Sequence, residues 1–354
     1  MSSIRAHFER REALYRHLGI VPSSIRGRRV AEFGPGSGHN AIYTASLLPS
    51  KYILIDANPT GLKETRENLS LGTPKEVDFQ IIESTIEDFV VTDHFDLVLC
   101  EGVLPWQIDP VAYAKKVGSL CQNSGIFVLT TIDAASFLGE SLRRLIAACL
   151  VPVQKSARDR LEVLEPFFAP HLATLAGMSR PVRDWIFDNI LIPYVGKPFS
   201  MKEAVEGLSV DFDFYASSPH FVTDWRWYKT LVGSNRHFNE NAVEIYLSNI
   251  GNIVDYRVTL QPHAPEIGFK ILTLADQLFF LMVEMERKQS TVRMKEAIEI
   301  IAGLESVIAP ISTVTATSFK EVIRFLSTTG QTALPTFQSF FGRGQQYLSF
   351  IRKT

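Results

Sequence analysis

The sequence predicts an α/β protein with a Rossmann-like sheet, and three observations lead to this expectation. Residues 28–33 form a short, largely apolar stretch that runs into residues 34–38 (GPGSG), where every second residue is glycine. A helical stretch follows, and a second apolar stretch, residues 52–55, closes on a single carboxylate, Asp56. This order is the first half of a nucleotide-binding βαβ unit, because glycine lets the backbone turn sharply and lets a ligand approach. We therefore expect a ligand site where the first two strands end.

The spacing of the glycines and one acidic residue narrow the choice of nucleotide. A dinucleotide fingerprint is G-x-G-x-x-G, and its helix N-terminus faces a pyrophosphate. Here the spacing is G-x-G-x-G, and His39 stands where the third glycine of that fingerprint would be. Glu32 lies two positions before the first glycine, where its charge would repel a pyrophosphate and attract an ammonium group. A ligand with a ribose, a cationic amino-acid end and no phosphate fits both facts, and Asp56 is placed to accept hydrogen bonds from the ribose hydroxyls.

These residues resemble motifs I and II of the class I S-adenosylmethionine-dependent methyltransferases. The resemblance rests on residues 32–38, which read EFGPGSG, together with Asp56. It implies a seven-stranded methyltransferase sheet and S-adenosylmethionine as the cofactor. The cofactor-binding residues that it implies in this sequence are Glu32, Gly34, Gly36, Gly38, Asp56, Ala57, Thr85, Ile86 and Glu101.

Two further stretches are similar to the same family. Residues 84–89 (STIEDF) resemble the adenine-binding stretch G-D-A-x-D-L, with Thr85 in the usual aspartate position and Ile86 in that of the small residue. Residues 94–106 resemble F-D-x-V-x-x-x-x-V-L-x-H of methyltransferases that act on small molecules, with Trp106 in place of the histidine. The [N/D]-P-P-[F/Y/W] motif of enzymes that methylate adenine, cytosine or glutamine amines is missing. The resemblance therefore indicates a small-molecule acceptor and no nucleic acid.

Composition limits the remaining choices. The 354 residues carry a net charge of −2, which argues against a nucleic acid or a broadly anionic partner. The three cysteines are widely spaced and form no C-x-x-C pair, which is typical of a reducing compartment without a disulfide framework. No stretch approaches 18 apolar residues, and no H-x-x-x-H or carboxylate cluster suggests a metal. We expect a soluble cytoplasmic protein without a membrane span or a bound metal.

The order of periodic stretches and prolines predicts five regions. They are an N-terminal helical lid at 1–27, the cofactor-binding core at 28–133, a helical cap insertion at 134–208, the end of the sheet with the acceptor-site segment at 209–262, and a helical C-terminal extension at 263–354. In the first region, Tyr15 either covers the cofactor or packs against the core. The last region includes a basic amphipathic tail around residues 347–353, and its helices either cap the sheet or form a homodimer interface.

An aromatic segment follows the predicted sixth strand, residues 210–215. Trp225 and Tyr228 are expected to bind the acceptor together with Trp106, because small-molecule sites combine aromatic walls with a few polar groups. His220 is the expected general base, and Asp224 either orients it or acts in its place. The alternative is that the aromatic residues belong to the core and that His220 only packs.

The resemblance thus implies methyl transfer to a hydroxyl or amino group of a small polar metabolite, such as a sugar, a nucleotide-sugar or a secondary-metabolite intermediate. Two alternatives stay open. The first is the same fold with other transfer chemistry, such as aminopropyl transfer, or a cofactor-binding scaffold without transfer. The second is a protein-modifying methyltransferase or a partner-binding module that recognises a macromolecule through its C-terminal helices.

Overall fold

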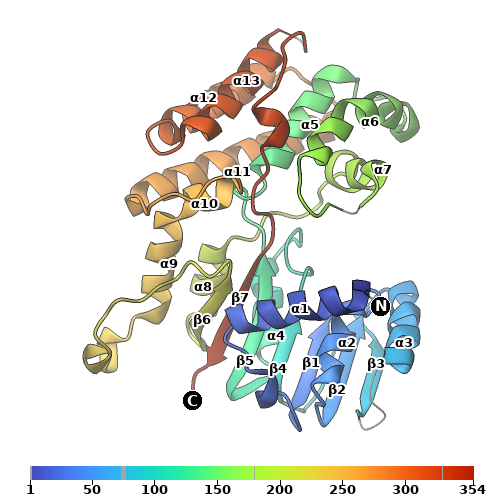
Figure 1. Cartoon of the computed structure of the whole chain (residues 1–354), viewed down its shortest axis with the longest axis vertical. Coiled ribbons are helices and arrows are strands. Elements are labelled where there is room, and N and C mark those ends of the chain that lie inside the picture. Colours follow the sequence, from blue (N-terminus) through green and yellow to red (C-terminus); the bar gives the residue numbers. More distant parts are fainter. Residues whose placement is uncertain (1, 73–76, 179, 329) are drawn as a thin grey trace. The chain divides into compact units, whose positions relative to one another are not determined.

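The computed structural model describes residues 2–72, 77–178, 180–328 and 330–354, and the chain divides into two compact units (Figure 1). We call them the sheet unit (Met1–Ile132, Gly196–Glu244 and Gln345–Thr354) and the helical unit (Asp133–Val195 and Ile245–Gly344). Each unit is described by itself.

The described residues of the sheet unit form one seven-stranded sheet in the order β3-β2-β1-β4-β5-β7-β6. Its strands are β1 (Arg29–Phe33), β2 (Lys51–Asp56), β3 (Phe79–Glu83), β4 (Phe95–Cys100), β5 (Cys121–Thr131), β6 (Phe212–Ser218) and β7 (Gln346–Arg352). Neighbouring strands among β1–β5 pair in parallel, and β7 is antiparallel to both β5 and β6. This sheet confirms the predicted Rossmann-like α/β fold.

Helices connect these strands. The sheet unit contains α1 (Ser2–His17), α2 (His39–Ser46), α3 (Pro59–Gly72), α4 (Pro110–Gly118), α8 (Met201–Leu208) and most of α9 (Phe238–Ser248). The residues of β2 from Tyr52 to Ile55 are all buried, as expected for a parallel strand that is covered on both faces. Asp109 accepts a hydrogen bond from the backbone of Ala112 and so caps α4, as the Asp109-Pro110 pair predicts.

The helical unit contains α5 (Leu138–Leu150), α6 (Ala157–Ala173), α7 (Val182–Ile186), α10 (Ile250–Val254), α11 (Pro265–Arg287), α12 (Met294–Ile308) and α13 (Thr313–Ser327). Except for α10, these helices lie in the two regions that the sequence predicts to be helical, residues 134–208 and 263–354. Pro265 is the first residue of α11, where its missing backbone donor costs nothing.

The tail around residues 347–353 is a strand and not part of a helical extension. It forms β7, which buries Leu348 and Phe350 and hydrogen-bonds to a strand on either side. Seven residues are too few for periodicity to separate a strand from a helix, and the pairing on both edges decides the outcome. The helices after residue 263 are therefore an insertion between β6 and β7, and the last residues of the chain return to the sheet (Figure 1).

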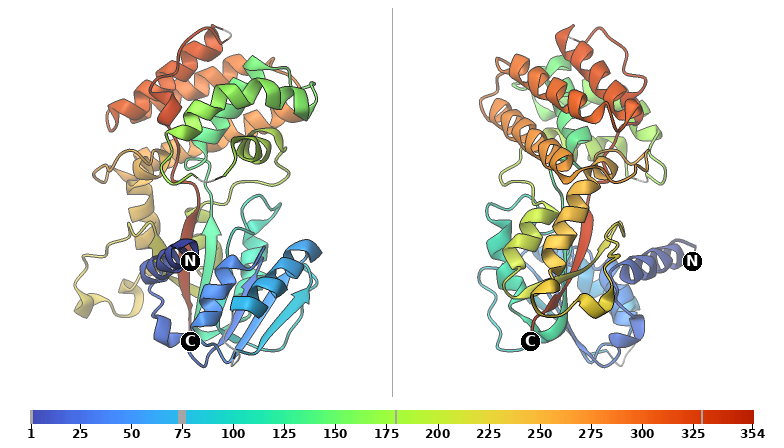
Figure 2. Two further views of the ribbon diagram at one scale, coloured as in Figure 1. Left: turned by 45° about the vertical axis from the view of Figure 1, so that its right-hand side comes forward. Right: turned by 90° about the vertical axis from the view of Figure 1, so that its left-hand side faces the viewer.

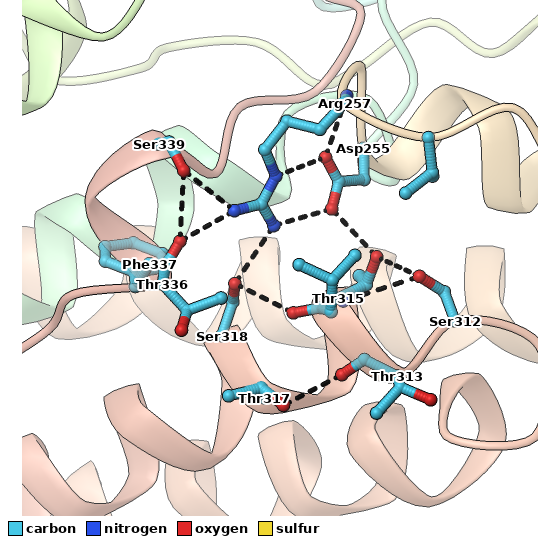
Figure 3. Close-up of polar contacts among 12 residues, drawn as sticks. Asp255, Arg257, Ser312, Thr313, Thr315, Thr317, Ser318, Thr336, Phe337 and Ser339 are labelled. Carbon is cyan, nitrogen blue, oxygen red and sulfur yellow. Dashed lines mark hydrogen bonds and ion pairs between the residues drawn. The ribbon is translucent and has the colours of Figure 1, made fainter.

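A buried polar network joins three segments of the helical unit (Figure 3). Arg257 forms a two-pronged ion pair with Asp255, at 2.9 Å and 2.7 Å, and the Thr315 hydroxyl also donates to the Asp255 carboxylate, at 2.8 Å. The same guanidinium donates to Ser318 at 3.1 Å and to the Thr336 carbonyl at 2.7 Å. The network holds the turn after α10 against the first part of α13 and against the returning chain.

Among the residues that the structure describes, no helix combines the length and the apolar character that a bilayer crossing requires.

Candidate cofactor site

A cavity of about 520 Å³ lies in the sheet unit where β1, β2 and β4 end. This is the crevice at which open α/β sheets bind their ligands, and its volume is in the range of small-molecule sites. Six of the nine predicted cofactor residues line it: Gly34, Asp56, Ala57, Thr85, Ile86 and Glu101. The other three, Glu32, Gly36 and Gly38, are not among its lining residues.

Glycine is required in the turn between β1 and α2. Gly34 has a φ of +70°, and a Cβ atom there would lie 2.2 Å from a Val103 methyl group. Gly38 has a φ of +79°, and a Cβ atom there would lie 2.8 Å from the Thr65 Cα. The Thr65 hydroxyl donates to the Gly36 carbonyl at 2.9 Å, so α3 holds the turn in place. The glycines away from the cavity thus shape the turn that places Gly34 at the cavity wall.

Asp56 is the last residue of β2 and brings its carboxylate to the cavity. One carboxylate oxygen accepts a hydrogen bond from the Asn58 backbone at 2.9 Å, which fixes the orientation of the side chain. A carboxylate fixed in this way can accept hydrogen bonds from two neighbouring hydroxyl groups.

The predicted adenine-binding stretch follows β3 along the same wall. The Thr85 hydroxyl donates to the Asp88 carboxylate at 2.9 Å and accepts from the Asp88 backbone at 3.1 Å. This hydroxyl is thus engaged within its own turn, and a direct role of Thr85 in ligand binding stays a prediction. Glu87 also lines the cavity and accepts a hydrogen bond from Tyr113 of α4, which closes that side.

Beside the cavity lies a cluster of buried charges. Arg11 of α1 donates to both carboxylate oxygens of Glu101 at 2.8 Å, and the two side chains are 6% and 9% exposed. Burial opposes the charge on Arg11, but the hydrogen bonds and the charge of Glu101 outweigh it and raise the pKa of Arg11. The Nε atom of Arg11 is buried without a hydrogen-bond partner among the described residues.

Glu32 belongs to the same cluster. It is 4% exposed and accepts a hydrogen bond from the Tyr52 hydroxyl. Burial, and then the nearby charge of Glu101, raise the pKa of Glu32 to about 7. A cationic group in the neighbouring cavity would favour the ionised form of this carboxyl.

Arg11 is not among the site residues predicted from the sequence. The helical spacing of Phe8, Arg11 and Tyr15 could have indicated it, because that spacing places all three on the face of α1 that packs against the rest of the sheet unit. Tyr15 is buried, and its hydroxyl forms a 2.7 Å hydrogen bond with the Thr44 hydroxyl. Tyr15 therefore packs against α2, which is the second of the two readings given above.

The predicted acceptor residues do not gather at this cavity. Pro105 and Gln107 line it, whereas Trp106 between them is half-buried and is not a lining residue. His220 is exposed, and its ring centre lies 6.1 Å from that of His17. Asp224 is bound on both oxygens by Arg226, at 2.9 Å and 2.6 Å. The roles of His220 and Asp224 in catalysis stay predictions.

Trp225 and Tyr228 also lie outside the cavity lining, and both are exposed. They are therefore not core residues, which was the alternative to an acceptor-binding role. Among the described residues, no group of three or more His, Cys, Asp or Glu side chains is arranged to hold a metal ion.

Residues 26–161 match the model of a protein family described as "Methyltransferase domain". No curated protein matches the sequence. Among solved structures, the chain is similar to PKMT2 from Rickettsia typhi in complex with AdoHcy, with 14% identity and a TM-score of 0.44 over 58% of this chain and 42% of that one. It is similar to the N-methyltransferase NodS from Bradyrhizobium japonicum in complex with S-adenosyl-L-homocysteine, with 18% identity and a TM-score of 0.31 over 36% of this chain and 62% of that one.

A third similar structure is the CcbJ methyltransferase from Streptomyces caelestis, with 18% identity and a TM-score of 0.30 over 36% of this chain and 50% of that one. The match thus spans less than half of the PKMT2 chain and no more than about two thirds of the others. Residues 26–161, with their glycine turn and the carboxylate that ends β2, thus match a methyltransferase domain and have its Rossmann-like fold.

Proposed function

We propose that this protein transfers the methyl group of S-adenosylmethionine to a hydroxyl or amino group of a small polar metabolite. The observation that carries the proposal is the cavity at the ends of β1, β2 and β4, which joins Asp56, Ile86 and Glu101 in one wall. Residues 101–106 (EGVLPW) support the small acceptor, because they lack the paired prolines that hold a planar amine.

The chain's own residues have three tasks in this reaction. When bound, S-adenosylmethionine supplies a methyl group on a sulfonium. Asp56 would accept hydrogen bonds from the ribose hydroxyls, and the backbone amide of Ile86 would face the adenine ring. Glu32 and Glu101 provide negative charge for the cationic amino-acid end. Alignment of donor and acceptor and the exclusion of water account for most of the acceleration in such a displacement.

One proton must also leave the acceptor. Glu101 lines the cavity, whereas His220 does not, so the two are distinguishable by substitution. If His220 is the base, His220→Gln slows turnover and leaves the affinity for S-adenosylmethionine unchanged. An unchanged turnover in that variant, together with a Glu101→Gln variant that turns over slowly but binds S-adenosylmethionine and unfolds as wild type does, assigns the proton transfer to the cavity carboxylate instead.

Methyl transfer can be tested with S-adenosylmethionine that carries a labelled methyl group. The protein is incubated with a cell extract that has been separated into a low-molecular-weight fraction and a protein fraction. The proposal predicts label in small molecules and release of S-adenosylhomocysteine. Label in the protein fraction alone would favour a protein-modifying methyltransferase, and cofactor binding without any release would favour a scaffold.

Location and assembly are part of the same proposal. The three cysteines are free thiols, which supports a cytoplasmic protein. A homodimer through the helices after residue 263 is a further proposal, and light scattering at two concentrations tests it.

A further inference from the structure

The loop between β6 and α9, residues 219–237, projects from the sheet unit (Figures 1 and 2). Four large apolar side chains on this β6–α9 loop are exposed: Trp225 (92%), Trp227 (60%), Tyr228 (66%) and Val232 (65%). We call these four residues and Lys229 the aromatic tip. Tryptophan is highly buried on average in folded proteins, and an exposed group of this kind marks an interaction site.

The exposure of the aromatic tip is built into the loop by one arginine. Arg226 points the other way, with its guanidinium bound to both oxygens of Asp224 and over the Phe238 ring at 5.8 Å. It also donates to the carbonyls of Asn235, at 3.2 Å, and Arg236, at 2.8 Å. Arg226 thus joins the first half of the loop to its last residues, and its flanking residues, Trp225 and Trp227, face outward.

The charge of the loop differs in sign from that of the whole chain. Residues 219–237 hold the cations Arg226, Lys229 and Arg236 and one anion, Asp224, whereas the chain carries a net charge of −2. Asp224 is neutralised by Arg226, and Arg236 lies 3.4 Å from a carboxylate oxygen of Asp213. The Lys229 ammonium lies 5.8 Å from the ring centre of Trp227 and 6.0 Å from that of Tyr228, and it forms no ion pair with a carboxylate of the described residues.

We propose that the aromatic tip binds the surface of an anionic lipid bilayer and places its rings at the level of the headgroups. Tryptophan and tyrosine concentrate at that depth, because their rings are apolar and each carries one polar group. A lysine beside them adds an attraction to anionic lipids. The anchoring is peripheral and local, and it is independent of the proposed methyl transfer.

Two other classes of partner fit the loop less well. A protein-docking surface is broad, with an apolar centre inside a polar rim. Here the apolar surface is confined to one projecting loop. A track for single-stranded nucleic acid needs a row of unpaired cations along the phosphates. Two of the three cations in this loop are already paired with carboxylates.

Vesicle sedimentation tests the proposal on the full chain. Wild type is expected to bind vesicles of phosphatidylserine and phosphatidylcholine, to bind pure phosphatidylcholine more weakly, and to release as salt is raised. The double variant Trp225→Ala/Trp227→Ala should bind the anionic vesicles at least tenfold more weakly. Lys229→Glu should weaken binding to the anionic vesicles and leave the weaker binding to pure phosphatidylcholine unchanged. Indole emission should shift to the blue on binding in wild type and not in the double variant.

The matched control is Val292→Ala, which removes an equally exposed apolar side chain from the helical unit and should bind as wild type does. Far-UV circular dichroism and thermal midpoints equal to those of wild type show that each variant is folded. The proposal is wrong if wild type ignores anionic vesicles, or if the double variant binds them as wild type does. Loss of an RNA or protein complex in the double variant without vesicle binding would also overturn it.

Discussion

Glu32, Glu101 and Arg11 place two carboxyl groups and one guanidinium in a nearly water-free space beside the cofactor cavity. The two-pronged pair of Arg11 and Glu101 satisfies one carboxylate, whereas burial, and then the charge of Glu101, make ionisation of Glu32 harder. Once Glu32 ionises, the site is short of one positive charge. A ligand with a cationic end supplies that charge, which is why this cluster suits S-adenosylmethionine better than a phosphate.

The raised pKa of Glu32 predicts a pH dependence of stability. The unfolded carboxyl ionises near its ordinary pKa of 4.5, whereas burial holds the folded one neutral up to about 7. The stabilisation from this group is complete below pH 4.5 and is lost as pH rises through 7. Relative to Glu32→Gln, wild type should therefore lose about 3 kcal/mol of unfolding free energy across that window. Urea unfolding of both proteins at several pH values measures this, and a constant difference between them would contradict it.

The pair of Arg11 and Glu101 predicts strong coupling between two residues ninety positions apart. Arg11→Ala leaves a buried carboxylate without its partner, which should cost about 3–5 kcal/mol of unfolding free energy. The double variant with Glu101→Ala should cost less than the sum of the single variants. The control is the exposed pair of Arg5 and Glu9 on the same helix, whose coupling should stay below about 1 kcal/mol. Equal coupling in the two pairs would remove the buried pair from this account.

Single residues differ in how well the sequence predicts their place. Gly34, Asp56 and Ile86 line the cavity as expected, because a glycine turn and a strand end are encoded within a few neighbouring positions. The partner of Glu101 was missed, because helical spacing can place Arg11 on the inward face but does not tell which carboxylate it meets. Trp225 and Tyr228 show the opposite case: their composition suggests a binding surface, but composition does not tell which way a loop faces.

At the scale of elements, β7 is the strand that could not be predicted from the sequence. Residues 346–352 pair with β5 and β6, two strands that lie more than 120 positions earlier in the chain. Phe350 is fully buried, with its ring centre 5.9 Å from that of Phe214. Helical spacing was an equally good description of so short a segment until its partners were known.

This placement predicts that the last residues hold the sheet together. Phe350→Ala should lower the unfolding free energy by about 3–5 kcal/mol, because it leaves a cavity between two strands. Lys353→Ala, three residues further on and exposed, should change it by less than about 1 kcal/mol. Urea unfolding followed by circular dichroism compares the two. Similar small effects in both variants would mean that residues 346–352 are not part of the sheet.

The network around Arg257 makes a similar prediction for the helical unit (Figure 3). Arg257→Ala leaves the fully buried Asp255 without its ion pair, and the expected loss is about 3–5 kcal/mol of unfolding free energy. Arg293 is the matched control, since it forms ion pairs in the same unit with its side chain 41% exposed. Arg293→Ala should cost less than about 1 kcal/mol. Two equal losses would show that the network carries no special stability.

At the scale of the whole molecule, the sheet unit could be predicted and the helical unit only in part. Residues 28–133 alternate strand and helix along the chain, so each motif predicts its neighbour. The helices of the other unit were found from their periodicity, yet their place in the chain order was not. That order depends on β7, because only the return to the sheet turns a C-terminal extension into an insertion.

The central claim concerns one cavity and one ligand: the crevice beside Asp56 binds S-adenosylmethionine. Isothermal titration calorimetry of the full chain with S-adenosylmethionine, NADH and ATP tests it most directly. We expect tight binding of S-adenosylmethionine alone. Asp56→Ala should weaken that binding at least tenfold, because charge-assisted hydrogen bonds of about 1.5–3 kcal/mol are lost, and Asp78→Ala, an exposed control at the other end of the parallel strands, should not. Tight binding of NADH or ATP without binding of S-adenosylmethionine would contradict the account.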